Sequence, residues 1–213
     1  MVRGSGRWRH ILLAAAILAV ALPDGAGAGK DETDWPCPGP KVERLSLAQV
    51  WRGELPALPA GSWAADREIA PLAARLASPD LPAGEIARLV RDFARRQPPE
   101  NRRARLLTLL QAVFETVDGQ RRRVIRRVEA FGRNQKRLVE RIVADTEALE
   151  QGRVPEEERT LVEARRDWNI RIFDDRRRMT RVVCEEPDRY ERHLFAVART
   201  IRTVLEETTE ARS

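Results

Sequence analysis

Apolar residues recur every three or four positions along two neighbouring parts of the chain, which is the pattern of helices that pack together. The first part divides into heptads, seven-residue repeats whose first and fourth positions, a and d, face a partner helix. Ten of its thirteen a and d sites are apolar, which predicts a coiled-coil helix over about 100–150. The a sites are Leu107, Phe114, Arg121, Val128, Gln135, Ile142 and Leu149, and the d sites are Leu110, Val117, Val124, Phe131, Leu138 and Asp145.

A second helix of the same kind is predicted over about 156–186. Gly152 and Pro155 precede it and are typical of a turn between two helices. Because a short turn makes consecutive helices antiparallel neighbours, residue i of the first helix should face roughly residue 305 − i of the second. Pro187 is expected to stop the second helix. Its expected seam residues are Leu161, Trp168, Ile172, Met179 and Val182.

Three shorter apolar stripes predict three shorter helices, at 64–77, from about 82 to 97, and at 189–207. Asp188 and Glu191 resemble a capping box at the start of the last one, because their spacing lets each side chain reach the backbone of the other. Period-two alternation, which is typical of strands, does not extend over any length of the sequence.

The segment 29–63 reads as extended and irregular, since its five prolines forbid a long helix. It also contains Trp35, Trp51 and Trp63, and three tryptophans are unusual in a disordered tail. We therefore expect this segment to pack its aromatic rings against the helices. Ser46 to Trp51 is expected to form one helical turn within it.

Together these elements predict an all-α fold: a long antiparallel two-helix coiled-coil hairpin on a small helical base. The hairpin arm covers 106–184, the base combines 64–105 with 185–207, and 208–213 is expected to be a frayed tail. A helix of about 50 residues reaches roughly 75 Å, so part of the arm should project from the base. The open ends of the hairpin, near residue 105 and near Cys184, are expected to meet at its foot.

The first 28 residues resemble a secretory signal peptide. Three arginines precede an apolar run from Ile11 to Leu22, and Ala26-Gly27-Ala28 fits the small-x-small pattern of a cleavage site. The run is shorter than the roughly 20 apolar residues that a membrane-spanning helix needs, although an uncleaved anchor is the alternative. The predicted location is the periplasm.

Two cysteines, Cys37 and Cys184, remain in the exported chain. An even number of cysteines in an exported protein favours a disulfide, and only one intramolecular pairing exists. A redox pair and a metal site are the alternatives. The C-x-x-C spacing of a redox pair is absent, and the exported chain offers few further Cys or His ligands for a metal.

Charge is nearly balanced, with 39 basic and 33 acidic residues, but arginine makes up almost all of the basic side chains. A GC-rich genome would explain this excess, and a solvated helix face would explain its placement. The functional alternative is an arginine collar that binds a protein partner or an anion, below an acidic tip. The candidate residues are Arg122, Arg123, Arg126, Arg127, Arg177, Arg178 and Arg181.

The sequence offers little for catalysis. His193 is the one histidine after the predicted signal, and a lone histidine is most often a packing or surface residue. The acidic pairs Asp174-Asp175 and Glu185-Glu186 lie among arginines and are expected to form ion pairs rather than to act as two catalytic carboxylates. Nucleotide-binding glycine motifs are absent from the sequence, and no cofactor or metal is predicted.

These observations predict a non-enzymatic periplasmic interaction protein: a scaffold, an accessory subunit or a chaperone whose hairpin contacts an envelope protein. The alternative is a peripheral envelope protein whose arginine collar meets anionic lipid. A homodimer through the arm is possible, and nucleic acid is not expected as a partner outside the cytoplasm. An enzyme would need a cleft around His193 or around a carboxylate pair.

Overall fold

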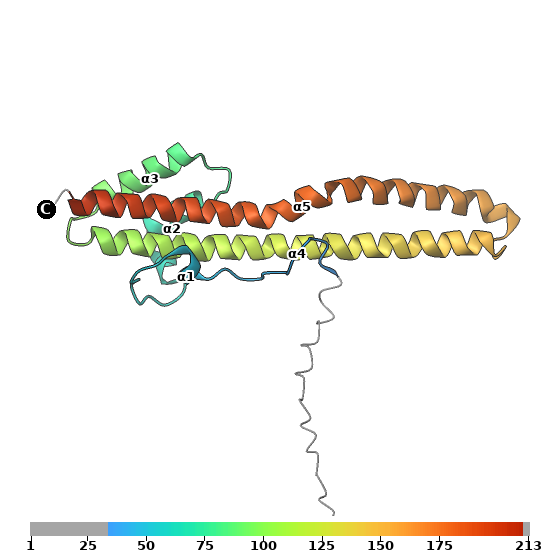
Figure 1. Ribbon diagram of the computed structural model, residues 1–213, viewed down its shortest axis with the longest axis horizontal. Helices are drawn as coiled ribbons and strands as arrows, with labels where there is room; N and C mark the ends of the chain where they lie inside the picture. The colour runs from blue at the N-terminus through green and yellow to red at the C-terminus, as the bar shows by residue number, and fades with distance from the viewer. Residues whose placement is uncertain (1–33, 211–213) are drawn as a thin grey trace, which may run out of the picture. The chain divides into compact units, whose positions relative to one another are not determined.

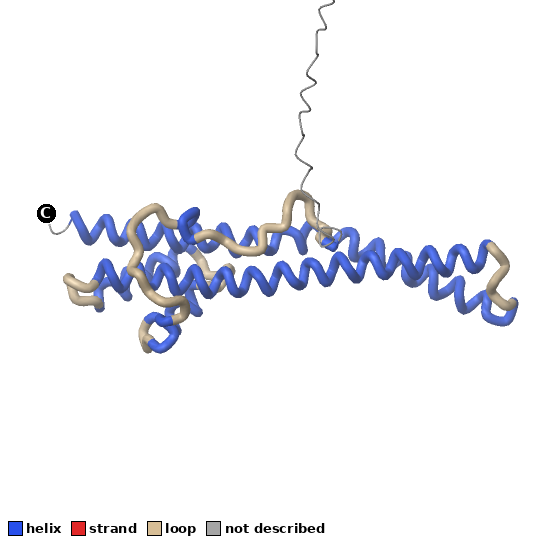
Figure 2. Tube along the Cα trace, turned by 90° about the horizontal axis from the view of Figure 1, so that it is seen from below, coloured by secondary structure: helices blue, strands red, loops and turns tan. Residues whose placement is uncertain are grey.

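The computed structural model describes residues 34–210, all of which belong to one compact unit. The predicted signal peptide at 1–28, the first residues of the irregular segment at 29–33, and 211–213 of the predicted tail lie outside the described residues. The described part is all-α and contains no strand, which confirms the predicted fold class (Figures 1 and 2). Its elements are α1 (Leu47–Val50), the 3-10 turn η2 (Ser62–Ala65), α2 (Ile69–Leu76), α3 (Ala83–Arg96), α4 (Arg102–Glu150) and α5 (Glu156–Glu210).

Helices α4 and α5 form the predicted antiparallel hairpin and lie side by side along their lengths (Figure 1). Gly152 makes the turn with a φ of +64°, a backbone conformation that favours glycine. Three contacts fix the register: Arg165 with Asp145, Gln135 Nε2 with the Phe173 carbonyl, and Arg121 with Glu191. Residue i of α4 therefore faces about residue 310 − i of α5, close to the expected relation.

The α4 seam confirms the heptad prediction, because all thirteen a and d sites are buried or half-buried. Two polar sites have specific partners. Asp145 accepts two hydrogen bonds from the Arg165 guanidinium, at 2.6 and 3.0 Å, and Arg165 lowers the pKa of this carboxyl. Arg121, at an a site, is only 4% exposed and donates to the Val42 carbonyl at 2.7 Å.

The predicted α5 seam is wrong. Four of its five residues are exposed, and only Ile172 is half-buried. The exposed fractions are 69% for Leu161, 61% for Trp168, 56% for Met179 and 58% for Val182. The seam instead uses a neighbouring stripe, which contains Val162, Arg166, Asn169, Phe173, Arg176 and Thr180, all buried or half-buried.

The predicted end of the helix at Pro187 is also wrong, because α5 continues through this proline to Glu210. A proline inside a helix costs about 3 kcal/mol. Contacts with α4 on both sides of Pro187, and a disulfide at Cys184, hold the two parts together and outweigh that cost. The predicted capping box does not form, since Asp188 and Glu191 lie inside α5. The ribbon of α5 changes direction where its orange part meets its red part (Figure 1), as expected of a proline kink.

The continuity of α5 explains the error in its seam. Near its C-terminal end, α5 places Leu194, Val197, Ile201 and Val204 in the main core. Steps of seven residues back from these positions lead to Val162, Asn169, Phe173 and Thr180. The core at one end therefore sets the rotation of the whole helix, and the more apolar stripe lies beside the seam, where most of it is exposed.

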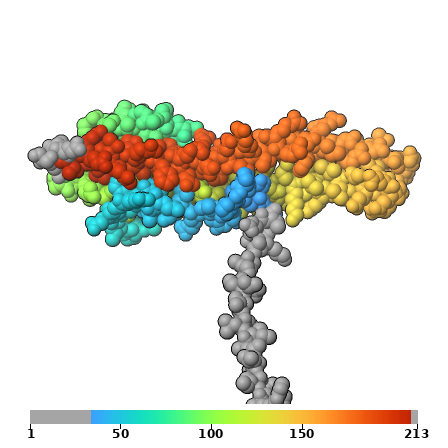
Figure 3. All heavy atoms as spheres, in the orientation of Figure 1, coloured from blue at the N-terminus to red at the C-terminus, as the bar shows by residue number. Residues whose placement is uncertain are grey.

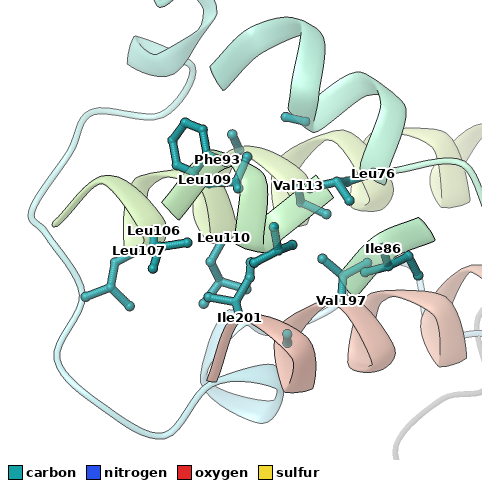
Figure 4. Close-up of a cluster of buried hydrophobic side chains, with 14 of the residues drawn as sticks. Leu76, Ile86, Phe93, Leu106, Leu107, Leu109, Leu110, Val113, Val197 and Ile201 are labelled. Carbon is teal, nitrogen blue, oxygen red and sulfur yellow. The ribbon is translucent and has the colours of Figure 1, made fainter. Parts of the chain in front are cut away.

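The base is built on the open end of the hairpin, where α2 and α3 pack against α4 and α5. Its core contains Leu76 from α2, Phe93 from α3, Leu110 from α4 and Ile201 from α5, together with smaller neighbours (Figure 4). The core cluster ends at Val117 on α4 and at Leu194 on α5. The remainder of the hairpin, which we call the distal half, has no apolar core beyond the seam between its two helices. The N-terminal segment also contacts it, as far as Gly132 of α4.

The segment 34–63, which we call the strap, runs along the hairpin on one face (Figures 2 and 3). Polar side chains of α4 hold it: Asp118 accepts from the Leu45 N–H at 3.0 Å, and Glu129 accepts from Lys41 at 2.7 Å. Trp51 is buried in the core and Trp35 and Trp63 are half-buried, so the strap packs its rings against the helices as predicted. Gly132 of α4 has no room for a Cβ, which would lie 2.0 Å from the Asp34 carbonyl oxygen.

The structure joins Cys37 to Cys184 by a disulfide, with a Cα–Cα distance of 5.5 Å. The predicted position of this bridge at the foot of the hairpin is wrong. Since α5 extends for 26 further residues, Cys184 lies near the middle of the hairpin, beside Arg121 rather than beside residue 105. The bridge therefore fastens the start of the strap to the distal half, ten residues beyond Leu194, where the core cluster ends.

Asp66 gives the base a stability that depends on pH. Its carboxylate caps α2 by accepting the Glu68 and Ile69 N–H groups at 3.0 and 2.9 Å, and it pairs with Arg105. Chiefly because of Arg105, the pKa of Asp66 falls from 3.8 to about 2. This lower folded-state pKa stabilises the protein above about pH 4, by about 2 kcal/mol, and the gain is lost as the pH falls toward 2.

We therefore predict that Asp66→Asn removes about 2 kcal/mol of stability at pH 7 and much less at pH 2. Urea denaturation at a series of pH values measures the difference. Asp188→Asn, at an exposed position on α5, is the matched control and should change little at either pH. Equal losses from Asp66→Asn at pH 7 and pH 2 would contradict the assignment.

Candidate partner-binding surfaces

The disulfide forms one wall of a groove between the strap and α5, with a volume of about 640 Å³. Three arginines and three carboxylates line it, so its charges balance. Arg181 pairs with Glu185 at 3.0 Å, and the buried Arg121 lies 3.9 Å from Glu191. Arg177 and Asp188 complete the charged lining. The other lining side chains are apolar or small: Trp35, Cys37, Pro38, Pro40, Val42, Thr180, Cys184 and Pro187.

The seven arginines proposed from the sequence do not gather in one site. Arg177 and Arg181 line the disulfide groove, whereas Arg122 and Arg123 line a separate recess beside Trp63. Arg126, Arg127 and Arg178 lie exposed and line neither of these hollows.

Several of these arginines are already neutralised by carboxylates of the same helix. Arg122 pairs with Asp118 at 3.3 Å, Arg177 with Asp174 at 3.8 Å, and Arg178 with Asp175 at 3.5 Å. Within residues 34–210, the side chains of Arg123, Arg126 and Arg127 make no hydrogen bond or ion pair. The seven arginines are therefore separate charges, and three of them are available to a partner.

The acidic pairs on α5 are ion-pair partners, as predicted. Besides the two aspartates, Glu185 pairs with Arg181 at 3.0 Å and Glu186 with Arg189 at 3.3 Å. His193 is a buried packing residue, and its Nε2 lies 2.6 Å from the Leu76 carbonyl oxygen. Because a carbonyl only accepts, Nε2 carries the proton and ties α5 to the end of α2.

The apolar side chains that were expected in the α5 seam form a second surface, which we call the outer stripe. It comprises Leu161, Trp168, Ile172, Met179 and Val182, with Arg165 and Asp175 at the two intervening sites. Its spacing of three and four residues is that of a coiled-coil seam, but most of it is exposed within residues 34–210. Ile172 is half-buried, and Arg165 reaches Asp145 of α4. The spacing of apolar residues along the sequence indicates this stripe. Because the stripe was predicted to pack on α4, its exposure was not predicted.

Two further features are absent from residues 34–210. This part of the chain has no cluster of three or more His, Cys, Asp or Glu side chains arranged to hold a metal ion. None of its helices combines the length and the hydrophobicity needed to cross a bilayer.

The fold and these surfaces define a class of protein: an all-α helical hairpin with a disulfide-fastened strap on one face and an exposed heptad stripe on α5. No protein-family model matches the chain. Neither a curated protein nor a solved structure is significantly similar to it. Its function is therefore argued from its own residues.

Proposed function

We propose that this chain is an exported interaction protein, such as a scaffold, an accessory subunit or a chaperone, that uses its helical hairpin to contact a partner. The observation that carries the proposal is the outer stripe. Large apolar side chains that are more than half exposed, repeated at heptad spacing, form a surface that gains free energy when a partner helix covers it.

The disulfide supports the proposed location. Disulfides persist mainly in oxidising compartments, of which the periplasm is one, and the sequence of residues 1–28 has the pattern of a secretory signal. Mass spectrometry of the protein purified from cell fractions tests this directly. We expect a periplasmic form that begins at Gly29 and contains no free thiol. A cytoplasmic chain that retains Met1 and two free thiols would overturn the location.

Site-specific photo-cross-linking in cells tests the contact function. A photoreactive residue in place of Trp168 should give a discrete cross-linked species, because this position lies at the centre of the outer stripe. Val143 of α4 is the matched control, since it is 48% exposed but lies outside the stripe. Cross-linking at neither position, or equally at both, would contradict the proposal.

A second candidate function is attachment to anionic lipid, favoured by the three unpaired arginines Arg123, Arg126 and Arg127. Reversing all three to glutamate should abolish binding to anionic vesicles, and high salt should weaken the binding of the unmodified protein. Reversal of the paired residues Arg177 and Arg178 is the control. Binding that survives the triple reversal would exclude this function.

A further inference from the structure

We propose that the partner of the outer stripe is a second copy of the same chain, which packs antiparallel against it so that two hairpins form a four-helix bundle. This inference rests on the proposed contact function and names its partner. The contact is centred on α5 near Ile170 and extends over about 158–182.

The face of α5 that carries the outer stripe is already a docking face in the base. There, Glu207 pairs with Arg91 of α3, and His193 holds the Leu76 carbonyl of α2. Steps of seven residues back from Glu207 and His193 lead along one line of the helix to Met179, Ile172 and Arg165. The short helices α2 and α3 therefore cover one half of a continuous face, and the other half is open.

A second line on the same face gives the same result. Arg189 pairs with Asp80, which lies in the connection between α2 and α3. Steps of seven back from Arg189 lead to Val182, Asp175, Trp168 and Leu161. Both lines of the outer stripe thus extend positions of α5 that α2, α3 and their connection contact in the base. A helical partner in the distal half would contact the same face of α5.

The position of α2 and α3 selects the antiparallel arrangement. If two copies packed in parallel through this face, the two α2–α3 units would meet across the seam and keep the stripes apart. In the antiparallel arrangement each unit lies beyond the tip of the other copy. The open part of α5, about 156–186, is roughly 45 Å long, so it accommodates the same length of a second copy.

The residues of the outer stripe are complementary when residue i of one copy faces about residue 340 − i of the other. Trp168 then packs on Ile172 and Leu161 on Met179, each twice by symmetry. Arg165 faces Asp175, so the two charged interruptions of the stripe meet. Arg165 contacts Asp145 through Nε and one terminal nitrogen, which leaves its other terminal nitrogen for Asp175. Asp175 contacts Arg178 through Oδ1, which leaves its Oδ2 for Arg165.

Long-range charge favours the same orientation. The tip of the hairpin is acidic, with Glu156, Glu157 and Glu158 opening α5, and the arginines from 176 to 181 lie at the other end of the contact. An antiparallel pair places each acidic tip beside the arginines at 176–181 of the other copy, whereas a parallel pair places like charges together.

Sedimentation equilibrium of the full exported chain tests the assembly. We expect a dimer, and we expect Trp168→Glu to raise its dissociation constant roughly 30-fold or more, because an aromatic anchor at the centre of a contact contributes most of its affinity. Trp168 is exposed in the single chain, so circular dichroism should show unchanged helicity. Val143→Glu, outside the stripe, should leave the dimer intact. A monomeric unmodified protein, or a dimer indifferent to Trp168→Glu, would overturn the proposal.

A thiol-specific cross-linker tests the orientation, because the two native cysteines are bonded to each other and an added cysteine is the one free thiol. In the antiparallel register, Arg171 lies beside Arg171 of the second copy, whereas Arg178 faces Ala164. We therefore expect Arg171→Cys to cross-link into dimers and Arg178→Cys not to do so. Cross-linking at both positions would show a parallel pair. An adduct of the Trp168 photo-cross-linker with a different protein would overturn the second copy as partner and leave the contact function standing.

Discussion

Replacing Cys37 and Cys184 together by alanine is expected to lower the free energy of unfolding by about 5 kcal/mol. The sulfur bridge joins residues 147 positions apart, and in the chain-entropy model a loop of this length strongly restricts the unfolded chain. Urea denaturation under oxidising conditions measures this loss.

The same variant should also loosen the start of the strap, because Lys41 with Glu129 and Arg121 with Val42 would then be its main polar ties near the bridge. Limited proteolysis should cut between residues 34 and 45 sooner than in the unmodified protein, while α4 and α5 stay intact. A loss of less than about 2 kcal/mol would mean that the unfolded chain is compact even without the bridge.

Leu110→Ala is expected to cost roughly 3–5 kcal/mol, because this side chain is fully buried in the core between α4 and the other helices of the base (Figure 4). The core cluster that contains Leu110 draws residues from α2, α3, α4 and α5, so its members cannot all move to fill the cavity. Global unfolding by urea measures the loss.

Leu138→Ala is the matched comparison, since Leu138 is also buried but lies in the distal half, outside the core cluster. Only two helices meet there, and they can approach each other, so the expected cost is roughly 2 kcal/mol. Hydrogen exchange should show faster local opening of the distal half, without a comparable change in the base. Equal global losses from the two variants would show that base and distal half unfold as one unit.

The sequence was sufficient for the helical hairpin because heptad periodicity is a local property that survives in the structure. All thirteen α4 sites follow it, and Gly152 turns the chain where a glycine was expected to do so. The disulfide followed from the number of cysteines alone. The two α4 side chains that hold the strap, Asp118 and Glu129, could not be predicted from the sequence. Isolated carboxylates are common on a charged helix, and nothing in their spacing indicates a contact.

The rotation of α5 was not predictable in the same way. Its two neighbouring stripes have the same spacing, and the more apolar of them was assigned to the seam. The choice depends on whether α5 is continuous at Pro187, because only a continuous helix transmits the rotation set by Leu194 and Ile201 to the distal half. The cost of a proline is local, whereas the contacts that outweigh it come from α4 and from Cys37, far away in the sequence.

The arginine collar was predicted as one site, but its members from the two helices line separate hollows. The arginines of α4 share one side of that helix, because positions 122 and 126, like 123 and 127, are four residues apart. Arg122 and Arg123 line the recess beside Trp63, whereas Arg177 and Arg181 of α5 line the disulfide groove. Their carboxylate partners, such as Asp118 one turn earlier, further reduce the net charge that a partner would meet. Spacing by three, four or seven residues was the informative pattern, both for the core and for the outer stripe.

The bridge between the strap and the middle of α5 has a consequence for the order of events during biosynthesis. Cys37 leaves the ribosome long before Cys184, so the bridge cannot form until nearly the whole polypeptide has been made. Closure also requires α5 to have turned back along α4, since only then do the two sulfurs meet. The disulfide therefore forms late, and it forms only if the hairpin has closed in its native register.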